Sequence, residues 1–146
     1  MFNIFGKSKK SKEEMQHAAI ELLDKHDKGE INDEVFLKDF GNVKVFYSTP
    51  LGNHKDGGQR LFLLTGPDNT GYHPVFTSQE RLAEFYQKVG RVGYMAINGS
   101  FVSALETAKE VNRKASVKMG LIIDPGYYDV TVDVVAIDTV LKIIKG

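Results

Sequence analysis

The spacing of apolar side chains changes near residue 42, and this change constrains the fold more than any other feature of the chain. Before it, apolar residues recur every three or four positions, which predicts one helix over residues 13–26 and another over 32–40. Asn32 suits the N-cap of the second helix, and Gly41 suits a left-handed residue directly after it. From Val43 onward apolar and polar residues alternate, which is the period of a β-strand.

Three extended segments follow this change, over residues 43–48, 61–64 and 72–76. A polar loop over 50–58 separates the first two, and a turn rich in Gly, Pro and Asn over 66–71 separates the last two. Strands joined in this way predict an antiparallel meander.

Helices and strands alternate in the second half of the chain. Thr77 and Glu80 match a capping box, which predicts a helix from Thr77 to about residue 88. Ser100 suits the cap of the next helix. Further strands are expected over residues 92–97, 117–123 and 130–134. The closing helix has an apolar face made of Ile137, Val140, Leu141 and Ile144.

A tight turn is expected where residues 124–127 read DPGY. Pro125 fixes φ at the second position of the turn, and Gly126 takes the positive φ of the third.

These segments predict an α+β fold with a mixed, largely antiparallel sheet covered by helices, preceded by an N-terminal helix pair. We expect a flexible basic leader over residues 1–12 and a single domain over 13–146. Within that domain the helix pair covers 13–41 and the α+β core covers 43–145.

Cysteine is absent from the chain, which excludes disulfides, thiolate metal sites and cysteine nucleophiles. No apolar run approaches the ~20 residues that cross a bilayer, so no stable membrane insertion is expected. The N-terminus lacks the apolar stretch of a secretion signal. The expected location is therefore cytoplasmic.

Charge is unevenly distributed, although the chain has 19 basic and 19 acidic residues. Four lysines and no acid lie in the leader, which leaves the rest of the chain with a net charge of −4. Such an acidic body argues against nucleic-acid binding, which needs a basic surface. The leader, with Phe2, Ile4 and Phe5, would either touch an anionic membrane or act as a mobile solubilising tail, and we favour the tail.

Catalytic and metal-binding motifs are missing from the sequence. The four histidines have no zinc-ligand spacing, and neither a P-loop nor a serine-hydrolase elbow occurs. Ser100 follows a strand and opens a helix, but capping explains its position more simply than nucleophilic catalysis. We therefore expect no catalytic residue, no metal and no cofactor. An enzyme would have to use His73 or His54 with an acid that the fold brings near.

Surface positions near two turns remain as candidates for ligand or partner binding. Exposed tyrosines after a tight turn are typical of protein-binding surfaces, and the equally weighted alternative is that Tyr128 packs inward and Tyr127 is incidental. The candidate residues are Tyr72, His73, Thr77, Asp124, Gly126, Tyr127 and Tyr128.

Three stretches in order, YHPVFTS at 72–78, KMGLIIDPG at 118–126 and the short strand with the closing helix, resemble the N-terminal domain of the SseB family, the enhanced serine sensitivity proteins. The resemblance covers residues 43–145, and the helix pair also fits. It implies a cytoplasmic α+β domain and carries over no catalytic residue. The family turn often has Asn where this chain has Asp124, which adds a charge. Some members have a second domain, and this chain is expected to contain only the first.

Two functions follow as hypotheses. The first is a non-enzymatic bacterial interaction module that binds another protein, or a second copy of itself, through its surface turns and aromatic residues. The alternative is a domain that senses an amino acid or related metabolite in a pocket between the sheet and the helix that opens at Thr77.

Overall fold

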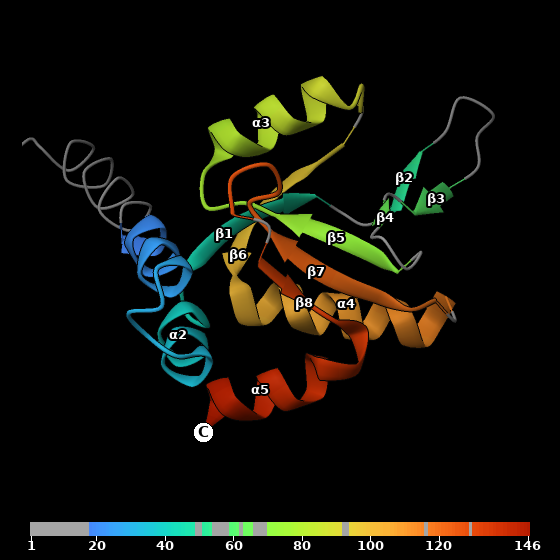
Figure 1. Cartoon of the computed structure of the whole chain (residues 1–146). Helices are drawn as coiled ribbons and strands as arrows, with labels where there is room; N and C mark the ends of the chain where they lie inside the picture. The colour runs from blue at the N-terminus through green and yellow to red at the C-terminus, as the bar shows by residue number, and fades with distance from the viewer. Residues whose placement is uncertain are drawn as a thin grey trace, which may run out of the picture.

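The computed structural model describes residues 18–48, 51–53, 59–61, 63–65, 70–91, 94–115, 117–128 and 130–146. These residues form an α+β fold, as the sequence predicts (Figure 1). In chain order the strands are β1 (Lys44–Ser48), β2 (Leu51–Asn53), β3 (Gln59–Leu61), β4 (Leu64–Thr65), β5 (Gly71–Val75), β6 (Ala96–Ser100), β7 (Met119–Ile123) and β8 (Val130–Val132).

Helices precede, separate and follow these strands. The N-terminal helix is described over residues 18–27. After it come α2 (Asp33–Phe40), α3 (Gln79–Lys88), α4 (Phe101–Ala115), the short 3-10 helix η1 (Val134–Ala136) and α5 (Ile137–Lys145). Figure 1 shows α3 on one side of the sheet, α4 and α5 on the other, and the N-terminal helix with α2 at one end.

β5 is an inner strand of the main sheet, whose order is β4-β5-β7-β8. It runs parallel to β7 and antiparallel to β4, while β7 runs antiparallel to β8. β1 and β6 form a separate antiparallel pair. Phe46 of β1 and Phe76, just after β5, exchange backbone hydrogen bonds of 2.7 and 2.8 Å, which joins this pair to the main sheet. The sheet is therefore mixed and largely antiparallel, as expected.

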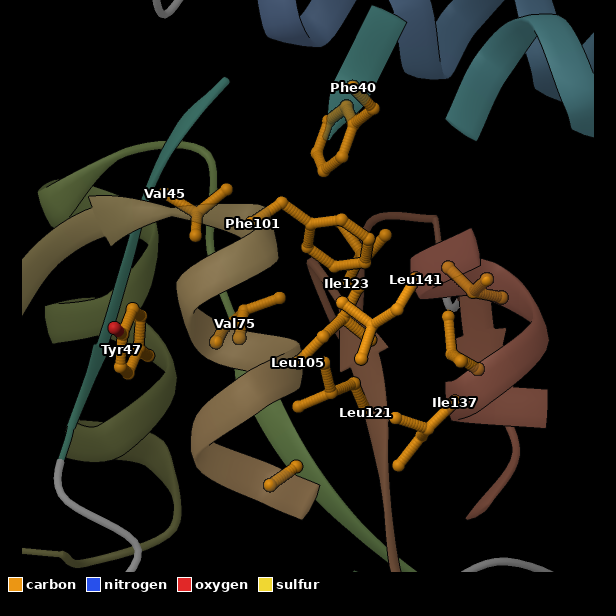
Figure 2. Packing of buried hydrophobic residues seen from close by; sticks show 14 of the residues in the cluster. Phe40, Val45, Tyr47, Val75, Phe101, Leu105, Leu121, Ile123, Ile137 and Leu141 are labelled. Carbon is orange, nitrogen blue, oxygen red and sulfur yellow. The ribbon is translucent and has the colours of Figure 1, made fainter. Parts of the chain in front are cut away.

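The main apolar core lies between the sheet and the helices α4, α5 and α2. Figure 2 shows Val75, Leu121 and Ile123 of β5 and β7 packed against side chains of α4 and α5. Phe40 of α2 contacts Phe101 of α4 edge to face, with 5.0 Å between ring centroids. The helix pair thus packs on the same core as the sheet. A second, smaller cluster, made by Phe76, Leu82 and Tyr86, lies under α3.

The predicted antiparallel meander is wrong. β1 pairs along its length with β6, and it meets the extended segment around β5 only through Phe46 and Phe76. The central pairing of β5 is the parallel one with β7, 48 residues along the chain (Gly71 with Met119). The expected loop over 50–58 begins with β2, which pairs with β3. The strand expected over 92–97 lies at Ala96–Ser100 instead.

Several local predictions are confirmed. Asn32 caps α2, since its side chain accepts a 2.8 Å hydrogen bond from the Val35 N–H. Ser100 caps α4 by accepting from the Ser103 N–H at 3.1 Å. Residues 124–127 form the expected turn, in which the Tyr127 N–H donates to the Asp124 carbonyl at 2.9 Å and Gly126 has a φ of +87°. The leader and residues 13–17 lie outside the described residues.

Gly41 corrects one local prediction. Its φ of −54° and ψ of −36° are right-handed, and its N–H donates to the Leu37 carbonyl as in a helix. Packing explains the glycine, because a Cβ at this position would lie 2.3 Å from Cγ2 of Ile144 on α5.

We predict that Gly41→Ala destabilises the protein by about 1–3 kcal/mol, because the added methyl overpacks a branched side chain that has little freedom to move. The backbone alone would favour alanine at this right-handed position. Chemical denaturation measures the effect. In an Ile144→Ala background the same substitution should cost clearly less, and an equal cost in both backgrounds would contradict the packing explanation.

Candidate functional site

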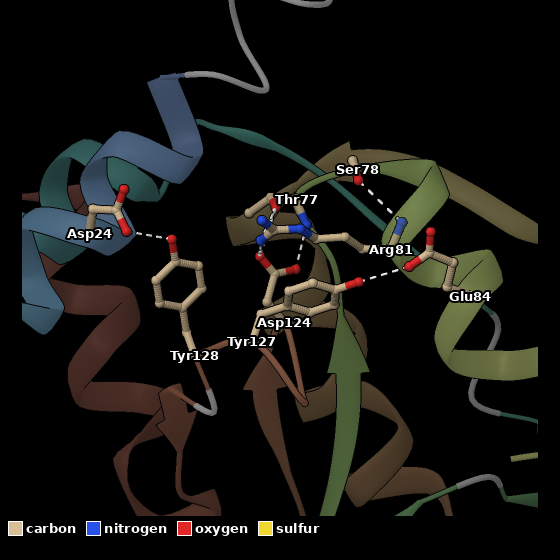
Figure 3. Close-up of polar contacts among 8 residues, drawn as sticks. All are labelled: Asp24, Thr77, Ser78, Arg81, Glu84, Asp124, Tyr127 and Tyr128. Atoms are coloured by element: carbon tan, nitrogen blue, oxygen red, sulfur yellow. Dashed lines mark hydrogen bonds and ion pairs between the residues drawn. The ribbon is translucent and has the colours of Figure 1, made fainter. Parts of the chain in front are cut away.

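The candidate site lies where the parallel strands β5 and β7 end side by side. Val75 pairs with Ile123 at these ends, and the Asp124 N–H donates to the Val75 carbonyl at 2.8 Å. In sheets with parallel strands, binding sites form preferentially beyond the carboxyl ends of the strands. Four of the predicted site residues, Thr77, Asp124, Tyr127 and Tyr128, converge at this edge (Figure 3).

Asp124 is the centre of the site. Its side chain is fully buried, so its carboxylate needs partners to offset the loss of hydration. Oδ1 accepts from the Thr77 N–H at 2.8 Å, and Oδ2 accepts from the Thr77 hydroxyl at 2.7 Å and from Nη1 of Arg81 at 2.6 Å. The Arg81 side chain is 20% exposed. We call this group, Thr77, Arg81 and Asp124, the Asp124 network.

The backbone of Asp124 is strained. Its φ of +47° makes it the one non-glycine residue with a left-handed backbone among those that the structure describes. Asp and Asn tolerate this conformation better than other side chains with a Cβ. The buried hydrogen bonds of the carboxylate hold the residue in it.

The predicted capping box at Thr77 is wrong. Ser78 is the N-cap of α3, and its hydroxyl accepts from the Arg81 N–H at 3.2 Å. Thr77 lies one residue earlier, where its N–H and hydroxyl both donate to Asp124. The Asp124 carboxylate therefore lies at the N-terminus of α3, where the helix dipole favours negative charge.

Tyr127 is held at the surface by two contacts. The Arg81 guanidinium lies 4.2 Å from the centroid of its ring, and its hydroxyl donates to Glu84 at 2.8 Å. This hydrogen bond raises the pKa of the Tyr127 phenol. The side chain stays 46% exposed, so a fixed aromatic ring faces solvent.

Tyr128 points to the N-terminal helix, where its hydroxyl donates to Asp24 at 2.5 Å. Burial, and then the hydrogen bond to Asp24, raise the pKa of this phenol to about 12. The contact joins residues 104 positions apart and fastens the helix pair to the turn. Tyr128 is thus partly buried, whereas Tyr127 is the exposed member of the pair.

Tyr72 and His73 lie away from this network. The Tyr72 ring passes over Gly120, where a Cβ would lie 3.1 Å from its Cδ1, and its hydroxyl donates to Asp133 at 2.7 Å. His73 is fully buried. Neither ring nitrogen makes a hydrogen bond of normal geometry among the described residues. Burial, and then the charge of Arg91, lower the pKa of His73 to about 4, and an interaction with the Ser48 backbone only partly offsets this fall in the pKa. His54 lies outside the described residues.

Arg81, Glu84 and Asp24 were not predicted as site residues. Thr77, Arg81 and Glu84 are spaced by four and three positions, which is one face of a helix, and this spacing could have identified Arg81 and Glu84. Nothing in the sequence connects Asp24 to Tyr128.

Neither a metal-ligand group nor a membrane-spanning helix occurs in the part of the chain that the structure describes. There, no group of three or more His, Asp or Glu side chains is placed to hold a metal ion. No helix among these residues is long and apolar enough to span a bilayer.

Comparison with protein-family models, with curated proteins and with solved structures found no match to this chain. The resemblance to the SseB family therefore stays a prediction.

We predict that Asp124→Asn destabilises the protein by about 2–4 kcal/mol, because it leaves the partly buried Arg81 without its counter-ion. Asn keeps an acceptor for the Thr77 N–H and tolerates the same backbone. Its NH2 replaces Oδ2, so the effect combines the lost charge with the loss of the two hydrogen bonds that Oδ2 accepts. Asp138→Asn is the matched control, since Asp138 pairs with Lys109 at 2.7 Å in full solvent. Equal unfolding free energies for the two variants would contradict a stabilising role of the buried pair.

We predict that stability falls as the pH is lowered from 6.5 to 4, because the folded state holds His73 neutral while the unfolded chain binds the proton. The lowered pKa corresponds to about 3 kcal/mol, fully present above pH 6.5 and lost near pH 4. Denaturant unfolding across this range measures it. His73→Leu should flatten this part of the profile, and an unchanged slope would show that other groups cause it.

Proposed function

We propose that this chain is a non-enzymatic interaction module that binds another protein through the surface of Arg81, Glu84 and Tyr127, which we call the Tyr127 surface. The observation that carries the proposal is that Tyr127 is half exposed and yet fixed, by the Arg81 stack and the Glu84 hydrogen bond. An aromatic ring fixed before binding loses little conformational entropy when a partner covers it. Tyr and Arg are also the residues that dominate binding energy at interfaces.

The buried chemistry beneath this surface supports a structural role. The Asp124 carboxylate accepts hydrogen bonds from Thr77 and Arg81, and these bonds fix the turn that carries Tyr127. His73, the histidine considered for an enzyme, is enclosed in the core with a pKa too low for a base near neutrality. The proposal keeps the cytoplasmic location and the SseB-like kinship that the sequence predicts.

The alternative function, metabolite sensing, has less support in the pocket that the sequence predicts between the sheet and α3. A ligand between the sheet and the start of α3 would meet Thr77, whose N–H and hydroxyl are already bound to Asp124. A thermal-shift screen over amino acids and nucleotides tests it, because a ligand at 100 times its Kd adds about 2.7 kcal/mol.

We predict that Tyr127→Ala weakens partner binding roughly thirtyfold, as for a central aromatic residue of an interface. The measurement is affinity capture from bacterial extract with quantification of each captured protein, followed by titration of the purified partner. Tyr127→Phe removes only the hydroxyl and should retain most of the binding, because the ring and its Arg81 contact stay.

Val89→Ala is the matched control, since Val89 is an equally exposed apolar residue at the other end of α3. Equal recovery of every protein by the wild type and all three variants would refute the Tyr127 surface as the binding site. Sedimentation of the purified chain shows whether the partner is a second copy.

A further inference from the structure

A pocket of about 240 Å³ opens beside β8, between this strand, the helix pair and α5. Its apolar lining comes from parts of the chain far apart in sequence, including Phe36, Ile123 and Val140. Four consecutive residues of the chain, 130–133, also line it. Successive side chains of a strand point to opposite faces, so a pocket lined by all four meets the strand along its backbone edge.

The orientation of that edge follows from Gly120. A Cβ on Gly120 would lie 2.4 Å from the carbonyl oxygen of Val132, so this carbonyl points toward β7. The N–H and C=O of one strand residue point to the same side and those of its neighbour to the other. Thr131 therefore directs its N–H and C=O outward. Among the described residues, neither group has a partner outside the sheet ladder.

The rim of the pocket carries negative charge. Asp33 has an 88% exposed side chain, and its Oδ1 contacts Nε2 of His26 at 2.7 Å. The His26 ring packs on Phe36, with 4.6 Å between centroids. Across the pocket, Oδ1 of Asp133 accepts from Tyr72, and Oδ2 has no partner among the described residues. Neither Lys nor Arg is among the lining residues, so the rim favours a cationic partner.

The pocket is large enough for one apolar side chain. A volume of 240 Å³ equals roughly eight water molecules at ~30 Å³ each, which exceeds the bulk of a Leu or Phe side chain. Val135, which follows β8 in η1, is 88% exposed, the largest fraction among the exposed large apolar residues of the described chain. A partner at the β8 edge could cover it.

We propose that the outer edge of β8 and this pocket bind an extended segment of a partner protein in which basic and apolar residues alternate. The residue paired with Thr131 points to the face of Asp133, so a Lys or Arg there meets a carboxylate. The residues of the partner segment on either side of that Lys or Arg point to the opposite face of the strand, where an apolar side chain enters the pocket. This is strand addition, in which backbone bonds and alternate side chains both contribute to binding. It uses no residue of the Tyr127 surface.

The test is a titration of the full chain with the capped peptide acetyl-LKLKL-amide, followed by NMR of the backbone amides. The proposal expects saturable binding with the largest shifts at residues 130–136. Acetyl-LELEL-amide should bind at least about fivefold more weakly, because it meets the acidic rim. LKLKL with N-methylated lysine amides should bind more weakly than LKLKL by a similar factor, since each lost hydrogen bond costs about 0.5–1.5 kcal/mol.

Variants of the protein separate the contributions. Thr131→Pro removes the outward N–H, which an edge strand tolerates, whereas Thr131→Ala keeps it as the matched control. Asp133→Asn should weaken the binding of LKLKL and should not weaken the binding of LELEL. If Thr131→Pro fails to fold, the N-methylated peptide makes the same test on the wild-type protein.

Any of three results would overturn the proposal. The first is equal binding of LKLKL and LELEL, and the second is equal binding of N-methylated and unmethylated LKLKL. The third is displacement of LKLKL by butylamine alone at the same concentration. Tyr127→Ala must leave peptide binding unchanged. Loss of peptide binding in that variant would assign the peptide to the Tyr127 surface, so the two proposals fail separately.

Discussion

The buried carboxylate of Asp124 is the interaction on which the rest of the structure depends. An isolated charge in an apolar interior is expensive, and here three hydrogen bonds from Thr77 and Arg81 offset that cost. The same residue directly follows β7 and begins a turn with a left-handed backbone, and its carboxylate lies at the N-terminus of α3. Because of it, the turn has one conformation, and Tyr127 and Tyr128 point in two defined directions.

This constraint relates the two surfaces. On one side of the turn the rigid Tyr127 ring faces solvent. On the other side Tyr128 fastens the helix pair, whose residues His26 and Asp33 then form a wall of the pocket at β8. The charge of Asp124 has its partner in Arg81, so the two residues act as one unit, and the two proposed surfaces depend on the same fixed turn.

Much of the fold was predictable where the signal is local. The caps at Asn32 and Ser100, the turn at residues 124–127 and the apolar face of α5 were all identified, because each depends on residues within seven positions of one another. Strand partners were not predictable in this way. β5 pairs with β7 across a stretch of chain that contains α3, β6 and α4, and no local pattern encodes that pairing.

For the candidate site, too, local features were predictable from the sequence and contacts between distant residues were not. The sequence by itself determined the helices, the turn and the residue types that gather at it, since spacing and backbone preference act over a few residues. Three features were decided only by the tertiary structure. The Thr77 hydroxyl donates to Asp124 instead of capping its own helix, His73 is buried, and the Tyr72 hydroxyl donates to Asp133. The physical reason is that burial and ion pairing depend on which distant segments pack together, as Asp24 and Tyr128 do across 104 residues.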